Sequence, residues 1–109
     1  MELNALTPHY SVAAQIDVSD LASIKAQGFE AIVCNRPDGE VDGQPSFASL
    51  KTAAEALGLI IHYIPMAGPV VTAEMIAQFK EVMKANQRVL GYCRTGNRSS
   101  ILWNAIQQA

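Results

Sequence analysis

The stretch Val89-Leu90-Gly91-Tyr92-Cys93-Arg94-Thr95-Gly96-Asn97-Arg98-Ser99 decides the fold, because an apolar, β-prone run leads through a short polar loop into an apolar-periodic run. This order predicts a strand over 88–92, a tight loop and a helix over 97–108. The backbone N–H groups of such a loop, with the positive end of the following helix, form a cradle for an oxyanion. The same field favours thiolate over thiol, so the sequence predicts that Cys93 is an activated nucleophile.

The polar residues of this loop each have a catalytic and a structural interpretation. Arg98 is expected to hold a substrate oxyanion, because a guanidinium offers forked, permanently charged donors. Arg94 faces either the same anion or solvent, while Ser99 and Ser100 either stabilise a leaving thiolate or cap the helix. A lone thiol at a strand end is also a common core residue, so packing is the alternative for Cys93. The residues expected to bind substrate are Arg36, Arg94, Thr95, Gly96, Asn97 and Ser99, and those expected to act in catalysis are Cys93, Arg98 and Asp38.

Composition limits the class of protein. The 109 residues are half apolar and 17% charged, which predicts one α/β domain over 1–109. A net charge of -2 argues against a nucleic-acid or anionic-membrane surface. The first six residues lack the basic start and apolar run of a signal peptide, and the apolar run over 57–61 is too short to span a bilayer, so a cytoplasmic location is expected. Two cysteines and two histidines without paired spacing predict no metal and no cofactor.

The rest of the chain alternates strand and helix patterns. Strands are expected over 11–16, 29–34, 59–64 and 88–92, and helices are expected to begin near Ser19, Ser46, Thr72 and Asn97. Four successive alternations predict right-handed crossovers and an α/β fold, with a mostly parallel four- to five-stranded sheet flanked by helices.

Ligand sites in such sheets lie beyond the carboxyl ends of the strands. The last three predicted strands are therefore expected to end at one edge, which brings Arg36, Asp38 and the loop over 66–71 toward Cys93. Arg36 either adds positive field there or forms an ion pair with Asp38 or Asp42.

The same arrangement brings Cys34 toward Cys93. Oxidation could then close a reversible disulfide that protects the nucleophile from irreversible damage. The alternative is a buried thiol that only packs in the core.

With these motifs placed, the chain resembles the phosphatase-like domain of the beta-lactamase hydrolase-like protein family. The resemblance implies a protein-tyrosine-phosphatase-like fold, similar to dual-specificity phosphatases. It also implies relatives in which a metallo-beta-lactamase-like domain concerned with persulfide chemistry follows this one. No histidine and aspartate cluster for such metals exists here, so that partner is expected to be a separate protein. The landmarks that carry the resemblance are Leu6-Thr7-Pro8, Gln15, Asn35-Arg36-Pro37-Asp38-Gly39, His62-Tyr63-Ile64-Pro65, and Tyr92 to Ser99 followed by Leu102-Trp103.

The loop departs from the phosphatase pattern in its length. In the phosphatases that the chain resembles, five residues separate the cysteine and the arginine of the loop, whereas four residues separate Cys93 and Arg98. This shorter spacing is similar to the active loop of single-domain rhodanese sulfurtransferases. A narrower cradle suits a compact sulfane-sulfur adduct at least as well as a phosphoryl group.

The second departure concerns the general acid. A phosphatase must protonate its leaving oxygen, and in the phosphatase resemblance an aspartate follows the proline that ends the preceding strand. Here no acid lies between Pro65 and Glu74, and only Asp38 or His62 could substitute. Sulfur transfer to a thiol acceptor makes no such demand, so this departure also favours sulfur.

Three functions stay open at this point, each with a small anionic ligand. The leading hypothesis is sulfur transfer through a Cys93 persulfide, with thiosulfate or a low-molecular-weight persulfide as donor. The second is hydrolysis of a phosphate ester through phosphocysteine. The third is a non-catalytic anion-binding module.

Overall fold

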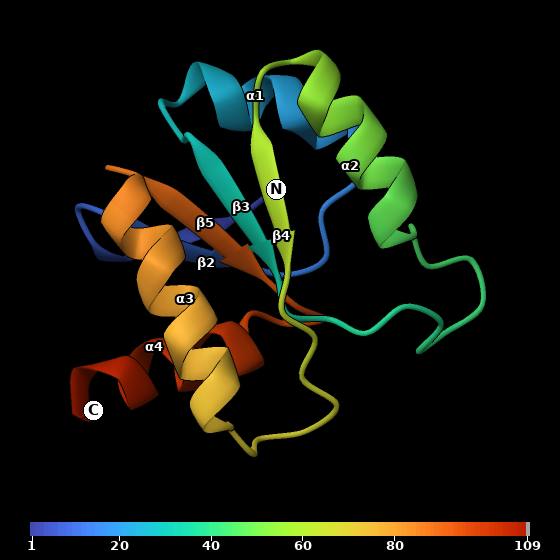
Figure 1. Ribbon diagram of the computed structural model, residues 1–109. Coiled ribbons are helices and arrows are strands. Elements are labelled where there is room, and N and C mark those ends of the chain that lie inside the picture. The colour runs from blue at the N-terminus through green and yellow to red at the C-terminus, as the bar shows by residue number, and fades with distance from the viewer. Residues whose placement is uncertain (109) are drawn as a thin grey trace.

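Five strands form one sheet in the computed structural model, which describes residues 1–108 (Figure 1). The order across the sheet is β1-β2-β5-β3-β4, which places β5 at the centre. β1 pairs antiparallel with β2, and the other neighbours pair in parallel. The mostly parallel α/β sheet expected from the sequence is thereby confirmed. The strands are β1 (Leu3–Thr7), β2 (Tyr10–Ala13), β3 (Ala31–Cys34), β4 (Ile60–Tyr63) and β5 (Val89–Tyr92).

Helices cover both faces of this sheet (Figure 1). Side chains alternate between the faces of a strand, so neighbouring residues of β3 enter different halves of the core. Ile32 packs under α1 and α2, whereas Val33 packs under α3 and α4. The helices are α1 (Leu21–Ala26), α2 (Phe47–Ala56), α3 (Ala73–Ala85) and α4 (Asn97–Gln108), with a single 3-10 turn, η1 (Val18–Asp20), leading into α1.

Helix starts follow the expected caps with one exception. The side chains of Ser46 and Thr72 accept backbone N–H bonds in the first turns of α2 and α3, as the sequence predicts. Ser19 was expected to begin the first helix, and this is wrong. Asp17 caps η1 instead: its carboxylate accepts the Val18 N–H, and its own N–H donates to the Asp20 carboxylate in a reciprocal capping box.

The two edge strands also differ from expectation. The sequence predicts no strand over 3–7, but β1 pairs there with β2, and β2 ends at Ala13 rather than continuing to Ile16. The apolar run over 59–64 predicts a buried strand, yet β4 forms the opposite edge of the sheet, with Ile60 54% exposed. Apolar letters alone do not distinguish a central strand from an edge strand, because exposure depends on which strand lies beside it.

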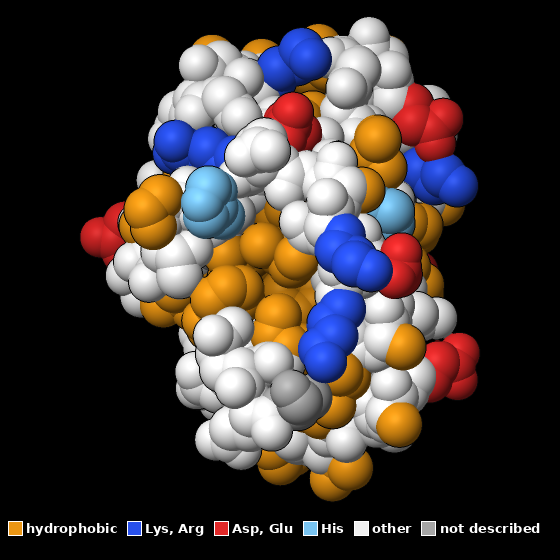
Figure 2. All heavy atoms as spheres, turned by 60° about the vertical axis from the view of Figure 1, so that its left-hand side comes forward, with side chains coloured by type: hydrophobic (Ala, Val, Ile, Leu, Met, Phe, Trp, Pro, Cys, Tyr) orange, Lys and Arg blue, Asp and Glu red, His pale blue; other side chains and the backbone are white. Residues whose placement is uncertain are grey.

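The side of the molecule that carries α3 and α4 has an apolar hollow. Figure 2 shows a hollow lined with hydrophobic side chains on this side of the molecule. The residues that line this hollow include Met83, Trp103 and Ile106, which are only partly buried against the core. Among the helices of residues 1–108, none is both long and apolar enough to cross a bilayer.

Candidate active site

The segment over 93–99 lies at the carboxyl edge of the sheet, where the loop after β5 leads into the first turn of α4 (Figure 1). The loops that follow β3 and β4 are tied to it. The Asn35 N–H donates to the Tyr92 carbonyl at 2.8 Å, and the Met66 N–H donates to the Asn35 carbonyl at 2.9 Å. The three strand ends therefore meet, as the parallel topology predicts.

The Cys93 thiol lies inside the loop, and the residue is 1% exposed. The Gly96 N–H donates to Cys93 Sγ at 3.0 Å. Burial raises the pKa of the Cys93 thiol, but hydrogen bonds from the backbone N–H groups of Ser99, Thr95, Arg98 and Gly96 together lower it by more. The pKa of Cys93 thus lies below its ordinary value, and the site stabilises a thiolate.

Gly96 is required by the shape of the loop. Its φ is +94°, a conformation that residues with a Cβ rarely adopt. Only in this conformation does its N–H turn inward to Cys93. Thr95 and Asn97 flank it with exposed side chains, and the Thr95 Oγ1 accepts the Asn97 N–H at 3.3 Å. These two residues shape the loop mainly through the backbone.

The two serines at the start of α4 have different surroundings. Ser100 Oγ donates to the Gly96 carbonyl at 3.1 Å, a bond within the helix. Ser99 is fully buried, and its Oγ has no partner among the described residues. The Ser99 carbonyl accepts the Tyr10 hydroxyl at 3.3 Å, which holds this turn against the core. A buried hydroxyl without a partner, next to an amide that binds Cys93, is available to stabilise charge on sulfur.

Arg98 binds an acidic residue, Glu40, that sequence reasoning did not single out. Its guanidinium forms a two-point ion pair with Glu40, at 2.7 and 2.8 Å, and donates to the Met66 carbonyl at 2.6 Å. The Glu40 carboxylate raises the pKa of Arg98, and the negative charge that Cys93 carries when ionised adds to this. Arg98 is therefore held near Cys93 by Glu40 and the Met66 carbonyl.

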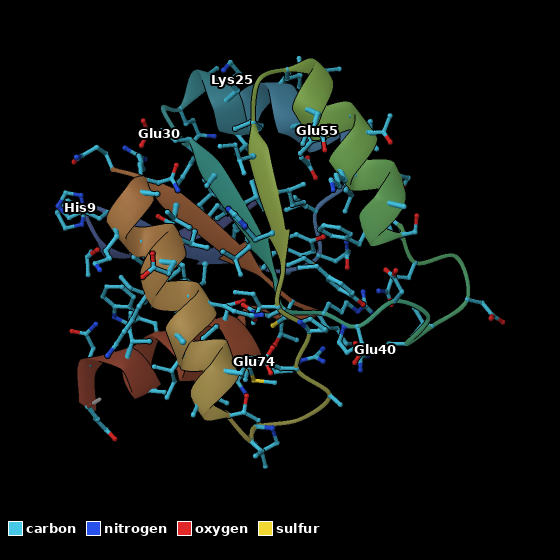
Figure 3. All side chains as sticks on the ribbon, in the orientation of Figure 1. His9, Lys25, Glu30, Glu40, Glu55 and Glu74 are labelled. Atoms are coloured by element: carbon cyan, nitrogen blue, oxygen red, sulfur yellow. The ribbon has the colours of Figure 1, made fainter. Side chains whose placement is uncertain are left out.

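Glu40 also binds a second arginine. Arg36 Nε donates to Glu40 Oε1 at 2.9 Å, and Arg36 Nη1 donates to Gln15 Oε1 at 3.0 Å. The ion pair expected for Arg36 with Asp38 or Asp42 is thus formed with Glu40 instead, because the turn at 38–43 places that carboxylate nearest both arginines. Bonds from Arg98 and then Arg36 lower the pKa of Glu40 to about 2. Figure 3 shows Glu40 on this loop, at the edge where the strands end.

Two other candidates take different positions. The Asp38 carboxylate accepts the Phe47 N–H at 2.8 Å, at the start of α2, and the Asp38 N–H donates to the Tyr63 hydroxyl at 3.0 Å. Asp38 therefore organises its own loop. The Arg94 side chain is exposed, and its carbonyl accepts the Gln15 N–H at 3.3 Å. Its position agrees with the solvent-facing interpretation.

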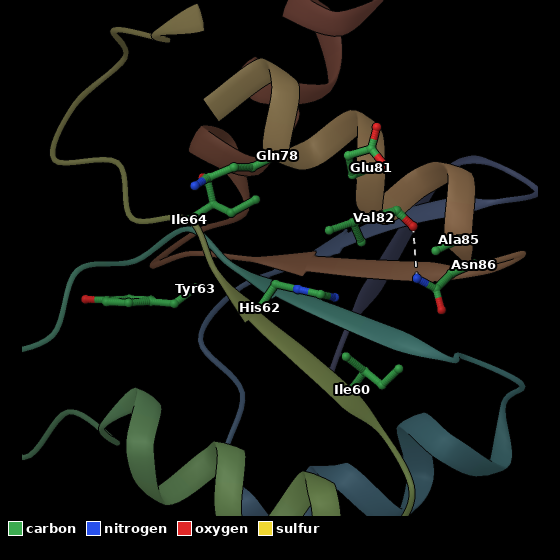
Figure 4. Close-up of a pocket in the computed structure, with 9 residues that line it drawn as sticks. All are labelled: Ile60, His62, Tyr63, Ile64, Gln78, Glu81, Val82, Ala85 and Asn86. Carbon is green, nitrogen blue, oxygen red and sulfur yellow. Dashed lines mark hydrogen bonds between the residues drawn. The ribbon is translucent and has the colours of Figure 1, made fainter. Parts of the chain in front are cut away.

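His62 lies in a different part of the molecule. It lines a groove of about 600 Å³ between β4 and α3, together with Gln78, Glu81 and Asn86 (Figure 4). The lining residues come from these two elements and the turn after α3, not from the loop over 93–99. Burial lowers the pKa of His62, which favours the neutral ring. The structure does not bring His62 to Cys93.

Cys34 has the opposite electrostatic character to Cys93. Its thiol is buried at the end of β3 and donates to the Arg36 carbonyl at 3.3 Å. Burial raises the pKa of Cys34, so this thiol stays protonated. Both cysteines are free, and the expected redox bridge stays a prediction. Within residues 1–108, no three histidine, cysteine or acidic side chains gather as metal ligands.

Comparison with known proteins identifies the family. Residues 2–109 match the model described as beta-lactamase hydrolase-like protein, phosphatase-like domain. The chain belongs to this family. A Beta-lactamase hydrolase-like protein of Agrobacterium fabrum is 36% identical to this chain over 104 residues. That alignment covers 94% of this chain and 24% of the relative, so the chain spans about a quarter of the relative's length.

Solved structures place the phosphatase-like domain among the phosphatase folds. A candidate phosphatase of Neisseria meningitidis Z2491 is 33% identical, with a TM-score of 0.84, over 94% of this chain and 74% of that one. The core catalytic domain of an S. cerevisiae PP-IP phosphatase, solved with citrate, gives a TM-score of 0.73 at 14% identity, over 97% of this chain and 64% of that one. The protein-tyrosine-phosphatase-like fold implied by the sequence resemblance is confirmed, and the family supports a phosphatase-like, cysteine-based chemistry.

Proposed function

We propose that this phosphatase-like domain transfers sulfane sulfur through a persulfide on Cys93. The observation that carries the proposal is the bond from the Gly96 N–H to Cys93 Sγ, within a ring of amides that lowers the pKa of the thiol. A thiolate held in this way is a nucleophile at neutral pH.

The transfer needs only the groups of this loop. The Cys93 thiolate attacks the outer sulfur of thiosulfate or of an organic persulfide. A new S–S bond forms to Cys93 while the donor S–S bond breaks, and the leaving sulfite or thiolate departs with the bonding electron pair. An acceptor thiolate then attacks the outer sulfur of the Cys93 persulfide and regenerates the Cys93 thiolate. Arg98 is expected to bind the donor's charged end, and the free Ser99 hydroxyl is expected to stabilise Cys93 as it becomes the leaving group.

The surrounding carboxyl groups favour sulfur over phosphate. Hydrolysis of a phosphate ester is assisted by a group that protonates the leaving oxygen. Glu40, with a pKa of about 2, is ionised and cannot supply that proton at neutral pH. One oxygen of Asp38 is occupied by the Phe47 N–H. Sulfite and thiolate leave without protonation, so sulfur transfer needs no general acid from Glu40 or Asp38.

Phosphomonoester hydrolysis through phosphocysteine is the second candidate. The similarity to the candidate phosphatase of Neisseria meningitidis supports it, together with an arginine placed beside the cysteine. In this alternative Asp38 replaces the acid missing after Pro65 and, after its loop rearranges, protonates the leaving oxygen.

Parallel assays separate these chemistries. One preparation is tested for thiosulfate:cyanide sulfur transfer and for aryl phosphate hydrolysis, with Cys93→Ser as the inactive control. The mass of the peptide containing Cys93 is measured after exposure to each donor. Sulfur transfer and a gain of one sulfur atom support the proposal. Hydrolysis with a phosphoryl adduct establishes the second candidate. Neither activity, with anion binding that survives in Cys93→Ser, establishes a non-catalytic anion-binding module.

We further propose that a separate metallo-beta-lactamase-like persulfide enzyme accepts or consumes the sulfur. The support for this is the family resemblance, which implies relatives with such a domain; the relative of Agrobacterium fabrum is about four times as long as the matched region and so has room for further domains. The same proposal places the domain in the cytoplasm, where two free cysteines remain reduced.

A further inference from the structure

A buried tyrosine joins the second strand to the first turn of α4. Tyr10 begins β2 and is 0% exposed. Its hydroxyl donates to the Ser99 carbonyl at 3.3 Å, across 89 positions of sequence. Burial raises the pKa of Tyr10, and the negative charge that Cys93 carries when ionised adds to this. The hydroxyl therefore keeps its proton at neutral pH and acts as a donor.

The Tyr10 ring is held on both sides by helices of the same face. It stacks on Trp103 of α4, with ring centroids 5.0 Å apart and planes inclined by 15°, and meets Phe79 of α3 edge-on at 5.2 Å. Gly91 leaves room for the hydroxyl, because a Cβ at that position would lie 2.0 Å from the hydroxyl oxygen. A ring held in this way places its hydroxyl at one point, which fixes where the Ser99 carbonyl lies.

The other backbone group of Ser99 faces the nucleophile. Burial raises the pKa of Cys93, and the Ser99 N–H makes the largest of the backbone contributions that lower it. The N–H and C=O groups of Ser99 flank one Cα within a helical turn, whose φ and ψ are restricted. A shift of the carbonyl therefore turns the N–H relative to Cys93 Sγ. Such a turn weakens the hydrogen bond, because its strength falls as its angle departs from linear.

We propose that Tyr10 is a positioning residue for the nucleophile, whose hydroxyl holds the first turn of α4 with the Ser99 N–H directed at Cys93 Sγ. The inference rests on the proposed nucleophilic role of Cys93, but not on which group Cys93 transfers. Tyr10 acts through Ser99, since its ring is buried among α3, α4 and the sheet. The reactivity of the sulfur is thus set in part by a strand that lies beside β5.

The test compares two variants that each remove one buried tyrosine hydroxyl. Tyr10→Phe keeps the ring and removes the donor to Ser99. Tyr92→Phe is the matched control, because Tyr92 is 1% exposed and precedes Cys93, but it packs in the other half of the core with its hydroxyl near the Cys34 thiol. The rate of Cys93 alkylation by iodoacetamide is measured against pH by mass spectrometry of the Cys93 peptide, which separates it from Cys34. Unfolding in urea gives the stability of each variant.

The expected result is a change in Cys93 in only one of these variants. A neutral hydrogen bond is worth roughly a fivefold change in an equilibrium, and part of this reaches Cys93 through Ser99. Tyr10→Phe is therefore expected to be alkylated about threefold more slowly where the wild-type thiol is partly ionised, and to titrate at higher pH. Tyr92→Phe is expected to lose similar stability with no change at Cys93. An unchanged or lower titration pH in Tyr10→Phe, or an equal shift in Tyr92→Phe, overturns the proposal.

Amide proton chemical shifts provide a second measurement that locates the effect. The Gly96 N–H also donates to Cys93 Sγ, at 3.0 Å, but from the turn before α4. Ionisation of Cys93 is expected to move both amide protons downfield in wild type, and Tyr10→Phe is expected to reduce the movement at Ser99 more than at Gly96. An equal reduction at both amides indicates general loosening and contradicts the proposal. Because no group is transferred in these measurements, their outcome is separate from that of the activity assays.

Discussion

Replacing Gly96 with alanine tests whether the inward-turned amide creates the thiolate. At a φ of +94° an alanine costs about 1–2 kcal/mol. Its Cβ would lie 3.4 Å from the Ala13 carbonyl oxygen, so strain rather than collision is the main penalty. Relief of that strain rotates the Gly96 N–H away from Cys93 Sγ, now 3.0 Å distant. A hydrogen bond to a charged group contributes about 1.5 kcal/mol or more, which is roughly a tenfold change in thiolate population.

The assay is the rate of Cys93 alkylation by iodoacetamide at a pH where the wild-type thiol is only partly ionised. Gly96→Ala is expected to react about tenfold more slowly and to titrate at higher pH. Gly43→Ala is the matched control, since Gly43 also has a positive φ, +79°, with open space around it and no contact with the thiol. Both variants should lose similar stability in urea, and only Gly96→Ala should lose reactivity. Equal reactivity of Gly96→Ala and wild type would refute the reasoning.

Other expected outcomes concern packing, acid stability and oxidation. A Cβ on Gly91 would lie 2.0 Å from the Tyr10 hydroxyl, so Gly91→Ala should cost about 1–3 kcal/mol by thermal unfolding, and an unchanged midpoint would contradict the packing described. The pKa of Glu40 falls from 4.5 to about 2 on folding, so its stabilisation is complete above 4.5 and lost as pH drops toward 2. The stabilities of wild type and Glu40→Gln should therefore differ by a constant amount above pH 4.5 and converge as pH drops toward 2. Mild peroxide should form a disulfide between Cys34 and Cys93, which mass spectrometry would detect as a bridged peptide that is absent from Cys34→Ser. Sulfinic acid at Cys93 without a bridged peptide rules the link out.

The surroundings of Cys93 can be predicted from the sequence because they are local. Cys93, Gly96 and Arg98 lie within six positions, and a strand, a turn and a helix start constrain that segment. The amide cradle then follows from backbone geometry, with little help from distant residues. The starts of α2 and α3 were predictable for the same reason, since a cap and the N–H it binds are three residues apart.

Glu40 could not be found in this way. It lies 58 positions from Arg98 in sequence, and a long turn-rich loop with several acidic residues gives no local reason to choose it over Asp38 or Asp42. The available signal was its spacing of four from Arg36, a common ion-pair separation. β1 escaped notice because its five residues carry only a weak alternation of apolar and polar side chains, and its pairing partner decides its structure.

The central place of β5 affects how the molecule opens. This strand is hydrogen-bonded on both sides, to β2 and β3, and the Cys93 N–H extends the pairing to the Ala13 carbonyl at 3.3 Å. Fraying begins at sheet edges, where fewer bonds must break. β1 can separate from the sheet while Cys93 keeps its surroundings, so amide hydrogen exchange should be slowest along β5. Cys93 thus follows the strand that is expected to open least often.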